Sequence, residues 1–144
     1  MGTKVFSWIA LILWMALIFS LSSQVEVQSN ELSKGITGII VRAVGKIAPG
    51  GEFDARALNH IVRKTAHFLL YFILGILAGD ALRRSGVEGY WWVILTLGIC
   101  LLYAGTDELH QLLVPGRGGQ LTDVLIDGTG AAIGIGLYWL VAKG

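Results

Sequence analysis

Charged residues are scarce in this 144-residue chain, and their scarcity decides the class of protein. Only 15% of the residues are Asp, Glu, Lys or Arg, whereas 54% are hydrophobic. The mean hydropathy is +0.68. Such a composition lies outside the range of soluble domains and predicts an integral membrane protein. The formal net charge is only +1, so the sequence lacks a polybasic or strongly acidic surface, and nucleic acid is not an expected partner.

Cysteine is almost absent as well. The single Cys100 cannot form an intramolecular disulfide, so cysteine usage says nothing about the compartment. Its position inside an apolar run indicates a small packing residue. Internal repeats and low-complexity tracts are also missing, and we therefore expect one membrane domain over residues 1–144.

Four apolar runs are long enough to cross a bilayer, which takes roughly 17 to 25 residues in a helix. We expect spans at about residues 5–22, 65–82, 91–113 and 123–142, with the second helix starting near Asp54. A signal peptide is the alternative for the first run. The apolar part of such a peptide is usually about 7 to 15 residues long, so an uncleaved helix is favoured.

Between the first two spans the hydropathy falls, and apolar residues recur at helical spacing with charged residues mostly between them. This pattern is typical of an amphipathic helix. Asn30 is a suitable N-cap and Pro49 ends the pattern, so we expect a helix over about 30–48 that lies along the membrane surface. The predicted fold is all-α: a four-transmembrane-helix bundle with an amphipathic surface helix between the first and second spans.

Two G-x-x-x-G spacings occur in this bundle, Gly75 with Gly79 and Gly130 with Gly134. Small residues at this spacing let helix backbones approach closely in lipid, where little hydrophobic drive holds helices together. We therefore expect the bundle to be compact.

Polar residues gather where connectivity brings four helix ends to one membrane face. With four crossings, the exits of the first and third spans and the entries of the second and fourth lie on the same side. This holds whichever way the protein is inserted. The groups that meet there are Ser22, Ser23 and Gln24, then Lys64, His67 and Tyr71, then Asp107, Glu108 and Gln111, and finally Asp123 and Asp127. At the opposite face, Asp80 is expected to form a local ion pair with Arg83 or Arg84.

The orientation of this polar face depends on conflicting counts of Lys and Arg. The raw count favours a cytoplasmic polar face. The acidic residues of the first loop and the compact Arg83-Arg84 pair in a short loop favour the reverse. We predict a multi-pass membrane protein with both termini cytoplasmic and the polar face outside.

Four segments of the chain form a recognisable set: RKTAHFLLY at 63–71, DELHQ at 107–111, VPGR at 114–117 and DVLIDG at 123–128. Together they resemble the VanZ-like family of small membrane proteins, which implies a location in the bacterial cytoplasmic membrane. Residues 19–24 are also similar to the end of that family's first helix, whereas residues 28–59 match no known pattern. At Asp127 many members of the family carry Asn instead. The resemblance implies a role at the cell envelope, linked to teicoplanin-type glycopeptide resistance, and supplies no reaction.

Ionisable residues inside spanning segments are costly and usually face a bundle interior with partners. One interpretation is structural: Lys64, Arg117 and the carboxylates neutralise each other and hold the helix ends together. For Lys64 and Asp123 taken singly, that interpretation is favoured. For the whole set a functional site is favoured, because more groups converge than pinning helices requires.

The first functional hypothesis is recognition of an envelope lipid or lipid-linked precursor by its phosphate headgroup. Arg117 suits bidentate phosphate binding, and its neighbouring glycines let backbone N–H groups approach an anion. We expect the substrate-binding residues to be Lys64, Tyr71, Gln111, Arg117, Asp123 and Asp127.

Two alternatives belong to other classes. One is a membrane-embedded hydrolase or transferase acting on such a lipid, with His67 and the Asp107 and Glu108 carboxylates as catalytic groups. Magnesium would suit the carboxylates, but a fixed ligand motif is missing, so the metal and any cofactor stay unassigned, as does the oligomeric state. The other alternative is a small transporter that relays charge through His67.

Overall fold

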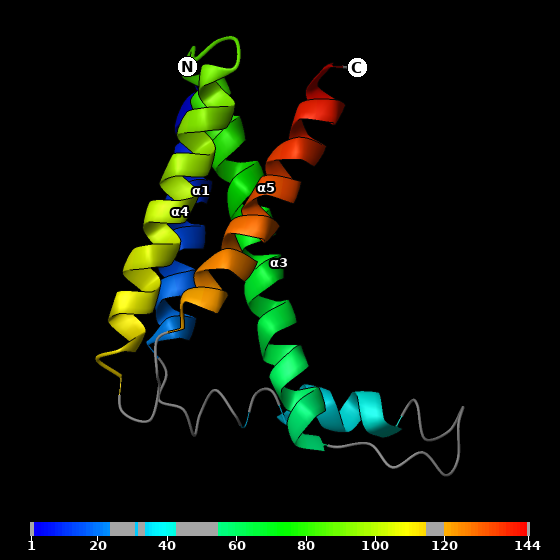
Figure 1. Ribbon diagram of the computed structural model, residues 1–144. Coiled ribbons are helices and arrows are strands. Elements are labelled where there is room, and N and C mark those ends of the chain that lie inside the picture. Colours follow the sequence, from blue (N-terminus) through cyan, green and yellow to red (C-terminus); the bar gives the residue numbers. More distant parts are fainter. Residues whose placement is uncertain (1, 24–30, 32–33, 43–54, 115–119, 144) are drawn as a thin grey trace.

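The computed structural model of the protein describes residues 2–23, 31, 34–42, 55–114 and 120–143 (Figure 1). Within these residues lie four long helices: α1 (Gly2–Ser22), α3 (Ala55–Arg84), α4 (Trp91–Gln111) and α5 (Leu121–Lys143). Each of the four is long and apolar enough to cross a membrane. The predicted all-α fold with four spans is therefore confirmed, and α3 begins next to the expected start near Asp54.

The expected surface helix is present in part. Residues 34–42 are helical, and Figure 1 shows this segment lying across the direction of the long helices, at the end of the molecule where α3 begins. Ile36 and Ile39 are exposed whereas Thr37 is buried, so apolar side chains of this segment remain available to lipid. The other residues of the expected 30–48 helix, apart from Glu31, lie outside the described residues.

The ends of α4 and α5 differ slightly from the expected spans. α4 ends at Gln111 because Leu113 and Val114 donate to carbonyls three residues back, a tighter turn than the α-helix. α5 begins at Leu121, and in its first turn the backbone N–H of Asp123 donates to the carbonyl oxygen of Gln120.

α3 and α5 pack backbone against backbone, and glycines make this possible. A Cβ atom added at Gly130 would collide with the carbonyl oxygen of Phe68, and one at Gly134 with that of Phe72. In the other direction, a Cβ at Gly75 would meet the carbonyl of Ala131. The expectation of close helix packing through G-x-x-x-G is confirmed for these glycines.

The centre of the bundle is small and apolar. Its fully buried residues come from all four long helices and include Ile18, Leu74, Ala78, Cys100 and Ala131. Cys100 is a packing residue, as expected. The outward faces carry exposed Leu, Ile and Phe side chains, which suit contact with lipid and not with water.

At the end of the bundle opposite the polar face, hydrogen bonds to Asp80 join α1, α3 and α5. Arg84 Nε donates to both of its oxygens at 2.8 Å, Ser7 Oγ donates at 2.6 Å and the Tyr138 hydroxyl donates at 2.9 Å. The expected ion pair is confirmed for Arg84. The alternative partner, Arg83, lies instead 5.7 Å from the ring centroids of Trp92 and Tyr138, where its planar charge faces aromatic surface.

The glycine contacts predict that Gly134→Ala destabilises the bundle, because the new methyl group must push α5 away from the backbone of α3. We expect a loss of about 1 to 3 kcal/mol in unfolding free energy, the usual effect of overpacking. Thermal unfolding in detergent would measure it. Gly136→Ala, on the same helix with nothing within 4 Å of the added atom, is the matched control. Equal melting temperatures for the two variants would contradict the close contact.

Candidate functional site

The four helix ends that the topology argument brings together do lie at one end of the bundle. Figure 1 shows α1 and α4 ending, and α3 and α5 beginning, toward the same side. Described polar residues from all four helices are buried or half-buried there. The convergence expected from connectivity is confirmed.

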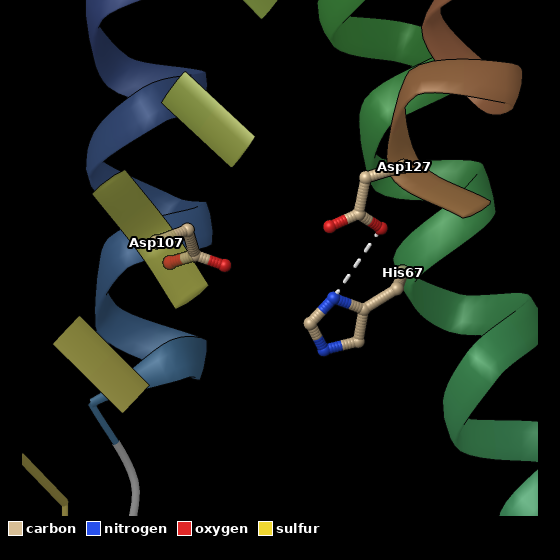
Figure 2. A group of neighbouring side chains, drawn as sticks. All are labelled: His67, Asp107 and Asp127. Atoms are coloured by element: carbon tan, nitrogen blue, oxygen red, sulfur yellow. Dashed lines mark ion pairs between the residues drawn. The ribbon is translucent and has the colours of Figure 1, made fainter. Parts of the chain in front are cut away.

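At the centre of this end lie His67 of α3, Asp107 of α4 and Asp127 of α5. One potential ligand atom from each side chain lies within 4.8 Å of the other two. Figure 2 shows the imidazole and the two carboxylates pointing into the same space between the helices. Three separate helices thus present three ionisable groups to one point.

Asp107 is held firmly by one of its two oxygens. Ser22 Oγ, at the end of α1, donates to Oδ2 at 2.7 Å. Gln111 Nε2, one turn further along α4, donates to Ser22 Oγ at 3.0 Å and to the same Oδ2 at 3.3 Å. Oδ1 is buried without a hydrogen-bond partner in the part of the chain that the structure describes. The two donors therefore orient the carboxylate and leave one oxygen unused.

Asp127 is entirely buried, at 0% exposure, and neither of its oxygens accepts a hydrogen bond from the described residues. Its ionisable neighbour is His67, whose Nδ1 lies 3.5 Å from Asp127 Oδ1. That separation is compatible with an ion pair and too long for a good hydrogen bond. Burying a carboxylate without donors is costly, so this oxygen pair calls for a further partner.

Lys64 and Asp123 form an ion pair between α3 and α5, with Nζ and Oδ1 2.5 Å apart. Each side chain keeps 24% of its surface exposed. This arrangement agrees with the structural interpretation of the two residues. Lys64 therefore already has an anionic partner, Asp123, when no ligand is bound.

Glu108 faces another side of α4 from Asp107, because neighbouring helix positions differ by about 100°. It is 6% exposed, and Oε2 accepts a hydrogen bond from the backbone N–H of Gln120 at 2.7 Å, just before α5 begins. Glu108 therefore fixes the entry to α5. It is not one of the three residues whose ligand atoms converge. The contact to Gln120 had no signal in the sequence, since it depends on where the loop backbone lies.

The remaining expected site residues fall into three groups. Tyr71 is fully buried one turn inside His67, its hydroxyl has no hydrogen-bond partner among the described residues, and its ring lies 6.3 Å from that of Tyr103. Gln111 is buried and takes part in the Asp107 network. Arg117 lies outside the described residues, as does Gln24.

His110 is an additional polar group at this end that no hypothesis used. Ser23 Oγ lies 3.1 Å from its Nε2, and its ring is 4.6 Å from the ring of Phe19. These contacts join α4 to the end of α1. His110 is thus a helix-joining residue at the rim of the site.

A groove of 520 Å³ runs between α4 and α5 beside the site. Most of its wall is apolar, with Leu101, Leu102 and Val124 among the lining residues. Glu108 and Gln120 supply polar groups to it. An apolar groove therefore reaches the polar end of the bundle from the side.

Comparison with known proteins gives one family. A family model described as VanZ/LLP1 matches residues 6–142, nearly the whole chain. No match was found among the curated proteins or among the solved structures.

The different surroundings of the two central aspartates predict different effects of the same substitution. Asp107→Ala removes the acceptor of Ser22 and Gln111, whereas Asp127→Ala removes a buried carboxylate that accepts no hydrogen bond from the residues that the structure describes. We expect Asp107→Ala to lower the unfolding free energy more than Asp127→Ala does, by about 1 to 3 kcal/mol. Thermal unfolding in detergent with a chelator present would measure both. A larger loss in Asp127→Ala would mean that Asp127 has partners in the folded chain.

Proposed function

The chain belongs to the VanZ/LLP1 family, and we propose that its polar end recognises the phosphate headgroup of an envelope lipid or of a lipid-linked envelope precursor. One observation carries the proposal: buried polar groups from four helices meet at one end of an apolar bundle, beside an apolar groove that reaches Glu108. A lipid likewise combines a polar headgroup with an apolar chain. Its chain would occupy the groove between α4 and α5, and its headgroup would lie among the polar side chains.

The positive charges for this role are Lys64 and Arg117. Arg117 offers a planar fork that matches two phosphate oxygens, and in the sequence it is followed by Gly118 and Gly119, directly before Gln120. Lys64 is half-buried and paired with Asp123. A phosphate would replace or share that partner, so the Lys64–Asp123 pair would keep the site neutral until a headgroup arrives.

A second candidate function is a membrane-embedded hydrolase or transferase acting on the same class of lipid. It is supported by the position of His67, which is partly exposed at 19% and has a buried carboxylate 3.5 Å from its Nδ1. An imidazole oriented by a carboxylate is a common general acid or base. In this version Asp127 would orient His67, and Asp107 would face the substrate.

Transport receives no support from the described residues. The Asp80 carboxylate at the opposite end is satisfied by Ser7, Arg84 and Tyr138. Buried Leu74, Ala78 and other apolar side chains separate it from the polar end. We therefore do not extend the proposal to a proton or ion path.

The cellular setting is part of the proposal. Lipid-linked envelope precursors are used outside the cytoplasmic membrane, so we propose that the polar end faces outward and that both termini are cytoplasmic. A link to teicoplanin-type glycopeptide resistance rests on family analogy alone.

The proposal predicts that purified protein binds a polyprenyl phosphate more tightly than the matching polyprenol, because only the former carries the anion. Native mass spectrometry of the detergent-solubilised chain would compare the two. Arg117→Gln and Lys64→Gln should each weaken phosphate binding by roughly tenfold, the value of one charge-assisted hydrogen bond. Lys34→Gln, which removes an exposed lysine paired with Glu31, is the control.

Equal binding of polyprenol and polyprenyl phosphate by every variant would contradict headgroup recognition. Release of product in the same incubation, lost in His67→Ala, would instead support the enzyme.

The orientation predicts the behaviour of a fused reporter. An alkaline phosphatase joined after Lys143 should be inactive, because that enzyme folds only outside the cytoplasm, whereas a fluorescent protein at the same point should be bright. An active phosphatase fusion would place the polar end on the cytoplasmic side.

A further inference from the structure

Four polar atoms at the centre of the site are buried and accept or donate no hydrogen bond within the described part of the chain. They are His67 Nδ1, Asp107 Oδ1 and both carboxylate oxygens of Asp127. Buried polar atoms without partners are uncommon in native proteins. Here they belong to side chains that point into one shared space (Figure 2). We propose that His67, Asp107 and Asp127 together bind one divalent transition-metal cation, Mn²⁺ or Zn²⁺.

The geometry suits a single ion. One atom from each residue lies within 4.8 Å of the other two. Metal–ligand bonds of about 2.0 to 2.2 Å place neighbouring ligand atoms about 3 to 4 Å apart. Small rotations of three side chains would therefore close the group around an ion, without any movement of the helices.

The charges agree as well. Asp127 is 0% exposed and Asp107 is 4% exposed, and two ionised carboxylates at such depth are strongly unfavourable unless their charge is balanced. The nearest lysine, Lys64, is already paired with Asp123. A divalent cation would balance two carboxylates next to a neutral imidazole.

The donor set indicates which ions fit. One imidazole nitrogen and two carboxylates favour Zn²⁺ or Mn²⁺, whereas Ca²⁺ takes oxygen ligands alone. Ser22 and Gln111 hold Asp107 through Oδ2 and leave Oδ1 for the ion. Such hydrogen bonds behind a ligand fix its orientation and strengthen metal binding.

Three protein ligands leave at least one position of the ion for water or another oxygen ligand. That position would accept a phosphate oxygen, which explains how an acidic cluster can serve an anionic headgroup. This last contact rests on the proposed function. The cation site itself does not, because it stands on the three side chains alone.

Titration calorimetry of the full chain, purified in detergent and stripped with a chelator, would test the site with Mn²⁺ and Zn²⁺ in turn and no added lipid. We expect one ion per chain. Asp127→Asn and Asp107→Asn should each weaken binding by about 100-fold or more, since even residues behind a ligand contribute about 10- to 100-fold. Asp80→Asn, which changes a carboxylate of α3 at the opposite end, should bind the ion like the unchanged chain.

The variants must be folded for this comparison. Asp127→Asn removes no hydrogen bond made by the described residues, so its elution and melting temperature without metal should match those of the unchanged chain. Failure of both ions to bind the unchanged chain, or equal binding by Asp127→Asn, would overturn the inference and indicate protonated carboxylates in a dry network. If the ion binds and polyprenyl phosphate does not, only the lipid proposal fails. If polyprenyl phosphate binds and neither ion does, only the metal proposal fails.

Discussion

The contact between the backbones of α3 and α5 is the interaction on which the polar end of this protein depends. Gly130 lies against the carbonyl of Phe68, and Gly134 lies against that of Phe72 one turn further on. This register fixes the neighbouring positions as well: His67 precedes Phe68, and Asp127 lies one turn before Gly130. In lipid, where apolar side chains gain little by leaving their surroundings, close packing of small residues provides much of the attraction between helices. The same contact that stabilises the bundle therefore sets the distance between an imidazole and a buried carboxylate.

The two ends of the bundle each contain an aspartate, and the two carboxylates differ in their hydrogen bonding. At one end Asp80 accepts hydrogen bonds from Ser7, Arg84 and Tyr138, so its charge is satisfied and it joins three helices. At the other end Asp127 is buried more deeply and accepts none from the described residues. The fold thus provides hydrogen-bond donors for Asp80, whereas Asp127 is buried without donors from the described residues, which is energetically unfavourable. Such arrangements are typical of sites that bind or react.

Much of the fold could be predicted because it depends on features that are local in sequence. Apolar runs of sufficient length gave the four helices, and counting the crossings placed their polar ends together without knowledge of any contact. The predicted second helix, from near Asp54 to about residue 82, correctly included Lys64, His67 and Tyr71. What could not be predicted depends on how each helix is rotated in the bundle. That rotation brings Asp127 Oδ1 to 3.5 Å from His67 Nδ1, turns Glu108 toward the backbone of Gln120, and lays Arg83 against Trp92 and Tyr138.

The central claim is that the polar end is a binding site built on unsatisfied buried groups, and anomalous X-ray scattering tests it most directly. Crystals of the full chain grown in lipid with Mn²⁺, and others grown with Zn²⁺, would each be measured at the absorption edge of the metal; the prediction concerns whichever ion binds. The account predicts one strong anomalous peak per chain, within bonding distance of His67, Asp107 and Asp127. A map with no peak there, in which the two aspartates share a hydrogen bond with each other or with His67, would contradict it.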